Sequence, residues 1–321
     1  MRRAGFGLAY FELGATDVEP VVVALHGLAS TGRSLRPVLG SLAERGARVL
    51  APDLLGHGAS EWPPDARYDV DDHLAALDAW AESAIGPRPV WLVGCSMGSL
   101  LALAWAARRP DRVRGVAAIS APLFASTSEA RMWLGRADPL AWLMLHAPWA
   151  ARVLCRTICG QRVPARRLST ARRFGPLLAR VLASSYGLGS VDAVRSKDAD
   201  PKDVHARLLD GLADCWLHSW PSLYGSFLHC IVERRAGSDL ERLRARRMPL
   251  LFLHGDRDLT APIGRARESA AFGGWALEEY RGGTHALVAT HASAVGRRLA
   301  SFIDDQPDSR RAVGHLSSGR G

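Results

Sequence analysis

Val90-Trp91-Leu92-Val93-Gly94-Cys95-Ser96-Met97-Gly98 is the most informative stretch of this chain. An apolar strand-like run leads into Gly-x-Ser-x-Gly, and an apolar helical pattern follows. A serine on such a sharp turn takes up a strained backbone, and Gly94 and Gly98 are needed because side chains there would collide with the strand and the helix. The turn would expose the Ser96 hydroxyl at the sheet edge and leave the Met97 N–H free to bind an oxyanion. A glycine-rich packing turn is the alternative.

Apolar runs alternate with helical patterns on both sides of this turn. Expected strands cover residues 18–25, 47–51, 90–93 and 113–119, with helices at 35–45, 70–85 and 97–109 between them. This alternation predicts an α/β fold with a mostly parallel sheet flanked by helices. It stops after residue 121 and resumes with strands at 250–254 and 275–280 and helices at 262–271 and 293–302. We therefore predict a core in two parts, 1–121 and 248–303, a helical insertion at 122–247, and a disordered tail at 304–321.

The net charge is concentrated in one segment. The 321 residues carry 41 Lys+Arg and 32 Asp+Glu, a formal charge of +9, and 48% hydrophobic residues exclude disorder as the main state. From Arg131 to Arg180, arginines outnumber the single acid, Asp138, and the rest of the chain is balanced. Trp133, Trp142 and Trp149 share this segment. It is expected either to be a packed helix with solvated arginines, or to line an acyl tunnel or touch an anionic membrane. No motif indicates nucleic acid.

Cysteine and histidine spacings predict neither metal nor cofactor. Cys95, Cys155, Cys159, Cys215 and Cys230 are odd in number and contain no CxxC pair, so we expect reduced, packed thiols rather than disulfides or a zinc site. His146, His205, His218 and His229 in the insertion show no HExxH spacing or carboxylate cluster. The longest apolar run, 140–154, is too short to span a bilayer, and the expected location is the cytoplasm.

Several motifs together resemble the α/β-hydrolase superfamily over nearly the whole chain except the insertion and the tail. His26-Gly27-Leu28 after the first buried strand resembles the family's oxyanion turn, and residues 52–60, Pro-Asp-Leu-Leu-Gly-His-Gly-Ala-Ser, resemble its PDxxGxGxS loop. The resemblance implies an oxyanion hole formed by the N–H groups of Leu28 and Met97. It also implies that His26 and His57 support the loops and that the insertion is a cap over the site.

A serine nucleophile needs a base, and the base needs a carboxylate, in the chain order Ser, Asp, His. After the expected strand 250–254, the family pattern places the acid at Asp258, with Asp256 as a turn-forming alternative. Gly282-Gly283-Thr284-His285 follows a strand and precedes a helix, so His285 is the expected base. His291 is the competitor, more simply explained as an exposed helix residue.

These residues predict a serine hydrolase that cleaves carboxylic esters with an apolar acyl or alcohol part, through Ser96, His285 and Asp258. The superfamily's dehalogenases and epoxide hydrolases attack with aspartate, whereas this chain has serine. A thioesterase and a C–C bond hydrolase use similar residues and stay open, as does a non-catalytic ligand-binding protein of this fold. The sequence does not define the oligomeric state.

Overall fold

The computed structural model describes residues 2–4, 7–160, 207 and 214–306. Within this part of the chain, eight strands form one sheet in the order β1-β2-β4-β3-β5-β6-β7-β8. The strands are β1 (Arg2–Ala4), β2 (Leu8–Leu13), β3 (Val21–Leu25), β4 (Arg48–Pro52), β5 (Val90–Cys95), β6 (Val113–Ile119), β7 (Leu250–Gly255) and β8 (Ala276–Tyr280). All neighbours from β4 to β8 pair in parallel. The predicted parallel sheet is confirmed. Two further strands, β1 and β2, were not predicted and pair antiparallel at its edge.

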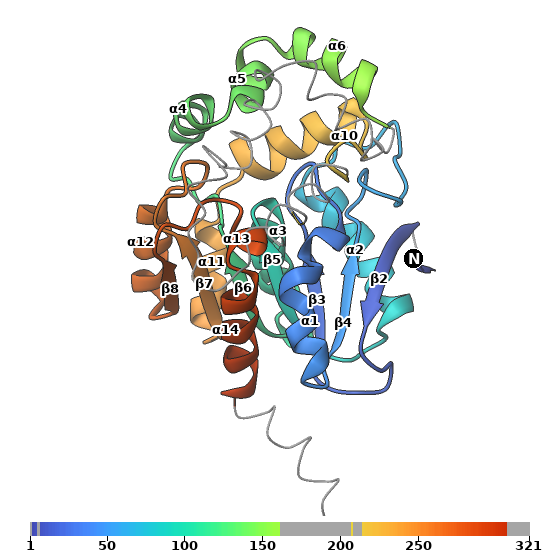
Figure 1. Cartoon of the computed structure of the whole chain (residues 1–321), viewed down its shortest axis with the longest axis vertical. Helices are drawn as coiled ribbons and strands as arrows, with labels where there is room; N and C mark the ends of the chain where they lie inside the picture. The colour runs from blue at the N-terminus through green and yellow to red at the C-terminus, as the bar shows by residue number, and fades with distance from the viewer. Residues whose placement is uncertain (1, 5–6, 161–206, 208–213, 307–321) are drawn as a thin grey trace, which may run out of the picture.

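Helices cover both faces of the sheet, and each face has its own apolar core (Figure 1). One core lies between the sheet and α1 and α14, and the other lies between the sheet and α2, α3 and α11. The bounds are α1 (Arg36–Glu44), α2 (Val70–Ala84), α3 (Met97–Arg108), α11 (Gly237–Ala245), α12 (Ile263–Gly273), α13 (Leu287–Thr290) and α14 (Ala292–Asp304), with 3-10 turns η1 (Gly32–Leu35) and η2 (Pro110–Arg112).

Local chemistry explains where these helices begin. The side chain of Asp69 accepts a hydrogen bond from the Asp72 N–H at 3.0 Å and caps α2. Helix α3 is buried along almost its whole length because it lies under the insertion and against the sheet. The central strand β5 is buried on both faces, so the turn that follows it is held by core packing.

Between β6 and β7 the chain forms helices over the carboxyl ends of the strands (Figure 1). They are α4 (Thr127–Ala137), α5 (Pro139–His146), α6 (Pro148–Ile158), α10 (Trp220–Gly225) and the π-helix η4 (Ser226–Val232). Helix α11, also inside the predicted insertion, instead packs on α3 and α12 beside the sheet. The division at residues 122 and 247 stays a prediction.

The last described residues bear on the predicted tail. Asp304 still belongs to α14, and its carboxylate pairs with Arg45 at 3.0 Å. The helix therefore runs into the first residue of the predicted tail, because this ion pair and the apolar face of α14 hold it to α1. Residues 307–321 of the predicted tail lie outside the described part of the chain. None of the described helices is long and apolar enough to cross a membrane.

Candidate active site

Ser96 lies on the predicted strand-to-helix turn. It follows β5 and precedes α3, with backbone angles of φ 52° and ψ −120°, a conformation that side-chain-bearing residues rarely adopt. A Cβ added at Gly98 would collide with the carbonyl oxygen of Leu25, and one added at Gly94 would collide with the backbone of Gly98. The two glycines are therefore required by the close approach of strand and helix, as expected. Next to Ser96, the Cys95 thiol is buried, and burial raises its pKa to about 12.

The structure brings Ser96, His285 and Asp258 together from three parts of the sequence. Nε2 of His285 lies 2.9 Å from the Ser96 hydroxyl, and Nδ1 lies 2.8 Å from Oδ2 of Asp258. His285 sits on the loop between β8 and α13, and Asp258 on the loop after β7. This geometry lets the imidazole accept the serine proton while the carboxylate holds its other nitrogen protonated.

Asp258 is held in its ionised form although it is buried. Burial raises its pKa, but the charge and hydrogen bond of His285, the charge of His254 and backbone hydrogen bonds outweigh this, and its net pKa is lowered. Oδ1 accepts the N–H groups of Thr260 and Ala261, both at 2.9 Å. Burial lowers the pKa of His285, but the charge and hydrogen bond of Asp258 outweigh burial, and its net pKa is raised.

Asp256 and His291, the alternatives to Asp258 and His285 in the sequence analysis, make other contacts. Oδ1 of Asp256 accepts the Gly282 N–H at 2.6 Å, so Asp256 shapes the turn that leads to His285. His291 precedes α14, half-buried rather than exposed as expected, because its ring packs 5.6 Å from that of Tyr280. Neither side chain contributes to the arrangement around Ser96.

His26 joins the two loops on which the predicted oxyanion donors depend. Its Nδ1 donates to the carbonyl of Gly27 at 2.7 Å, and its Nε2 accepts the Leu54 N–H at 2.8 Å. The ring is fully buried, and burial lowers its pKa to about 4, so it stays neutral at physiological pH. In the described part of the chain, the N–H groups of Leu28 and Met97 donate to no protein acceptor, which leaves both available to a ligand.

The loop after β4 is built around Asp53. Its two carboxylate oxygens accept the N–H groups of Gly32 at 2.8 Å and Ala59 at 2.9 Å. A Cβ on Gly58, at φ 58°, would collide with this carboxylate, so glycine is required there. His57, on the same loop, is fully buried, and burial holds its pKa well below the ordinary value. The predicted supporting role of this motif agrees with these contacts.

A cavity of about 210 Å³ opens at Ser96 and His285 beneath the inserted helices. Most of its lining is apolar and comes from the insertion, including Leu134, Leu140, Met144, Leu154, Leu223 and Phe227. Leu28 and Ala29 line it on the core side. Such a cavity accommodates a small molecule with an apolar portion next to the serine.

Three residues of the insertion form a group that sequence reasoning missed. Cys155 and Cys159, at the end of α6, lie next to His218, and all three line the same cavity. All five cysteines are unbridged, as expected for reduced, packed thiols, but the sequence analysis did not foresee that two of them lie beside His218. The missed signal is the pattern Cys-x3-Cys followed by Cys-x2-His at Cys215 and His218. His205 lies outside the described residues.

Comparison with known proteins agrees with this architecture. A family model of the alpha/beta hydrolase fold matches residues 20–143. The chain is 43% identical to a haloalkane dehalogenase of Bradyrhizobium diazoefficiens over 120 residues, 36% of this chain and 37% of that protein. It is 28% identical to a pimeloyl-[acyl-carrier protein] methyl ester esterase of Chromobacterium violaceum over 89% of this chain and 95% of that one.

Among solved structures, a bromoperoxidase from Bacillus anthracis superimposes with a TM-score of 0.65 at 21% identity, covering 95% of this chain and 99% of that one. The match to the dehalogenase spans only about a third of that protein's length. The sheet order, the strained serine turn and these matches agree with one another: the chain has the α/β-hydrolase fold.

Proposed function

We propose that the protein is a serine hydrolase that cleaves carboxylic esters with an apolar acyl or alcohol part. The observation that carries this proposal is the hydrogen-bonded chain from Ser96 through His285 to the buried carboxylate of Asp258. Serine is a weak nucleophile without a base, and this arrangement supplies the base, its orientation and a charge to stabilise the imidazolium. The esterase relative that aligns over 95% of its own length supports the same reaction class.

The reaction would proceed in two halves. Ser96 Oγ attacks the ester carbonyl carbon as Nε2 of His285 takes its proton, and the Leu28 and Met97 N–H groups bind the oxyanion that forms. The imidazolium then returns the proton to the alcohol oxygen, the ester bond breaks, and an acyl-enzyme remains. Water attacks this acyl-enzyme with His285 again as the base, which releases the carboxylic acid and restores the Ser96 hydroxyl.

A fluorophosphonate probe and a substrate panel test this assignment. The probe is expected to label Ser96, and Ser96→Ala should lose labelling and about 10⁶-fold of p-nitrophenyl ester turnover without unfolding. Ser30→Ala is the matched control, because Ser30 lines the same cavity but its hydroxyl donates to Ser34. Unchanged turnover in Ser96→Ala would overturn the mechanism. Faster turnover of thioesters or dienone acids would reassign the substrate, and a wild type that neither reacts nor turns over would indicate a binding protein.

Halide release from haloalkanes belongs in the same panel, since dehalogenases are among the relatives. We expect none, because Ser96 stands where the superfamily's dehalogenases use aspartate. An alkyl-enzyme formed on a serine would be an ether, which the second hydrolytic step would not cleave. Halide release by the wild type above the uncatalysed rate would contradict this expectation.

The same proposal extends to location and surface. Four side chains of α6 lie together and are exposed: Trp149 (73%), Val153 (59%), Arg152 and Arg156; Trp142 of α5 is 49% exposed. Aromatic and arginine side chains on one exposed face suit contact with an anionic membrane surface. We place the protein in the cytoplasm, where its unbridged cysteines would stay reduced. Residues 161–180 of the basic segment lie outside the described part.

A further inference from the structure

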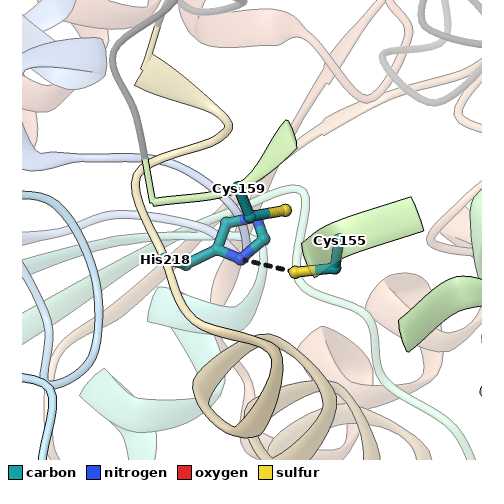
Figure 2. A group of neighbouring side chains, drawn as sticks. All are labelled: Cys155, Cys159 and His218. Carbon is teal, nitrogen blue, oxygen red and sulfur yellow. Dashed lines mark hydrogen bonds between the residues drawn. The ribbon is translucent and has the colours of Figure 1, made fainter. Parts of the chain in front are cut away.

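Two thiols and an imidazole, none of them among the residues assigned to the reaction, converge at the end of α6 (Figure 2). Sγ of Cys155 lies 4.0 Å from Nδ1 of His218, and Sγ of Cys159 lies 3.8 Å from its Nε2. One potential ligand atom from each side chain lies within 4.8 Å of those of the others. Cys155 and His218 are buried, and Cys159 is partly buried.

These separations suit side chains that share an ion. Ligands bound tetrahedrally to Zn²⁺, with Zn–S of about 2.3 Å and Zn–N of about 2.0 Å, are separated by roughly 3.5–3.8 Å. One ion binds a single imidazole nitrogen. The 3.8 Å from Cys159 Sγ to Nε2 lies at the upper end of this range, whereas the 4.0 Å contact of Cys155 Sγ is to Nδ1, so that thiol would have to move toward Nε2 for the three side chains to share one ion. Thiolate with imidazole is also the ligand combination that favours zinc over magnesium, calcium or manganese.

The backbone around the three residues is fixed by bonds that need no ion. The Gly160 N–H donates to the carbonyl of Trp216 at 2.8 Å, which holds the end of α6 against the segment that carries His218. The Gly58 N–H donates to the carbonyl of Leu217 at 2.7 Å, which ties that segment to the loop after β4. The three side chains are thus presented to one another by a preformed frame.

The orientation of the imidazole also suits a ligand. Nδ1 of His218 lies 3.3 Å from the carbonyl oxygen of Ser219, so a proton on Nδ1 can be donated there. The lone pair of Nε2 is then available to a metal. Metal-binding histidines commonly show this arrangement, in which the second ring nitrogen is fixed by a carbonyl or carboxylate.

From these contacts we propose that Cys155, Cys159 and His218 bind one Zn²⁺ ion. The fourth position is left for water or for Cys215, a buried thiol that lines the same cavity. The ion would join residues 59 and 63 positions apart in the sequence and clip the inserted helices together. Its role is structural, because the hydrogen-bonded serine, histidine and aspartate already form a complete hydrolytic relay.

Metal content of the full-length protein tests the proposal independently of any activity. Protein purified under reducing conditions without chelator and loaded with zinc should retain about one ion per chain after desalting. The triple variant Cys155→Ser/Cys159→Ser/His218→Ala should retain almost none. Titration with Co²⁺ should give thiolate-to-metal absorption in the near ultraviolet and the visible bands of a tetrahedral ion, both lost in the triple variant. Chelation should lower the thermal midpoint of the wild type by about 5 °C and leave the triple variant unchanged.

Matched controls separate ligand loss from misfolding. Cys230→Ala removes a buried thiol that donates to Tyr68, and His146→Ala removes an exposed imidazole of α5; both should bind metal as the wild type does. Circular dichroism checks the fold of each variant. The single variant His218→Cys should still bind Zn²⁺, because cysteine also supplies a soft ligand. Equal metal content in wild type and triple variant would overturn the proposal. So would reduced wild type that binds neither Zn²⁺ nor Co²⁺, or a Cys155–Cys159 disulfide that persists under reducing conditions.

Discussion

Oδ2 of Asp258 lies 2.8 Å from Nδ1 of His285, and the carboxylate that makes this contact has no exposed side-chain surface. Solvent therefore does little to screen its charge, and the pKa of His285 is raised above its ordinary value of 6.5 despite burial. In the proposed mechanism, His285 acts as a base only when it is neutral. The pH at which activity appears consequently reports on this one pair.

The first prediction concerns the acid limb of kcat/KM. It should have a midpoint above pH 6.5, and Asp258→Asn should move the midpoint to lower pH, because removing the negative charge lowers the pKa of His285. The same change should reduce kcat by about 10⁴-fold. Asp256→Asn is the matched control and should leave the midpoint in place, since Asp256 contacts Gly282 rather than the imidazole. A midpoint that moves equally in both variants would contradict the assignment of Asp258.

The second prediction concerns His26 as a positioning residue. His26→Ala removes the bonds to Gly27 and Leu54, so the turn that presents the Leu28 N–H should loosen. We expect kcat to fall by up to about 10²–10³-fold, the loss typical of one oxyanion donor, with a smaller change in KM. The acid limb should not move, because His285 keeps its partner. A shifted midpoint with unchanged kcat would argue against this role, and steady-state kinetics across pH distinguishes the outcomes.

The third prediction compares two glycines in helices. Gly98→Ala should destabilise the protein by about 1–3 kcal/mol, since its methyl group would collide with the carbonyl oxygens of Leu25 and His26. Gly40→Ala in α1 meets nothing within 4 Å and should stabilise by about 0.5–1 kcal/mol. Urea unfolding of both variants measures the difference. Equal effects would mean that the close approach of α3 to β3 carries no strain.

The fourth prediction concerns acid sensitivity. Burial lowers the pKa of His26 to about 4 and that of His73 to about 3, and it lowers the pKa of His57 as well. The unfolded chain therefore binds more protons below about pH 6.5, and stability present above that pH is lost as the pH falls. Each histidine should contribute about 1.4 kcal/mol per pH unit below the unfolded pKa. Urea midpoints between pH 7 and pH 5 should fall less steeply in His73→Gln than in wild type, and equal slopes would contradict the prediction.

The fifth prediction concerns the exposed face of α6. Replacing Arg152 and Arg156 together by alanine should weaken binding to phosphatidylserine-containing vesicles by about 30-fold, at roughly 1 kcal/mol per arginine. Arg36 and Arg281 are exposed on the sheet domain, and their joint replacement is the charge-matched control. Vesicle sedimentation measures binding, and turnover of a small soluble ester should stay unchanged in both variants. Equal loss of vesicle binding in the two double variants would mean that net charge, rather than this face, determines binding.

The sheet and the serine turn were predictable because their signals are local. The run from Val90 to Gly98 contains the strand, the strained turn and the helix start, and the sites of Asp258 and His285 each follow a readable strand. The hairpin strands β1 and β2 lacked such a signal, since only the first half of β2 is fully buried and charged residues interrupt the pattern.

The proximity of Cys155, Cys159 and His218 could not be predicted from the sequence for a different reason. Its members are separated by up to 63 positions, and only the packing of α6 against the turn at residues 214–218 brings them together. A search for metal sites that accepts only CxxC spacing misses Cys155 and Cys159, which are four positions apart. His291 was placed on the surface because helical spacing does not reveal the ring of Tyr280 that covers it.

The cavity beneath the inserted helices is lined both by Ser96 and by four cysteines, Cys95, Cys155, Cys159 and Cys215. Reagents directed at sulfur and reagents directed at serine would therefore act in one chamber. A mercurial or maleimide bound at the thiols would stop turnover by occupying space the substrate needs, although no cysteine belongs to the proposed relay of Ser96, His285 and Asp258. Inhibition by a thiol reagent would thus show that the reagent fills the cavity, not that a cysteine is the nucleophile. Only the residue that acquires the acyl group would identify the nucleophile.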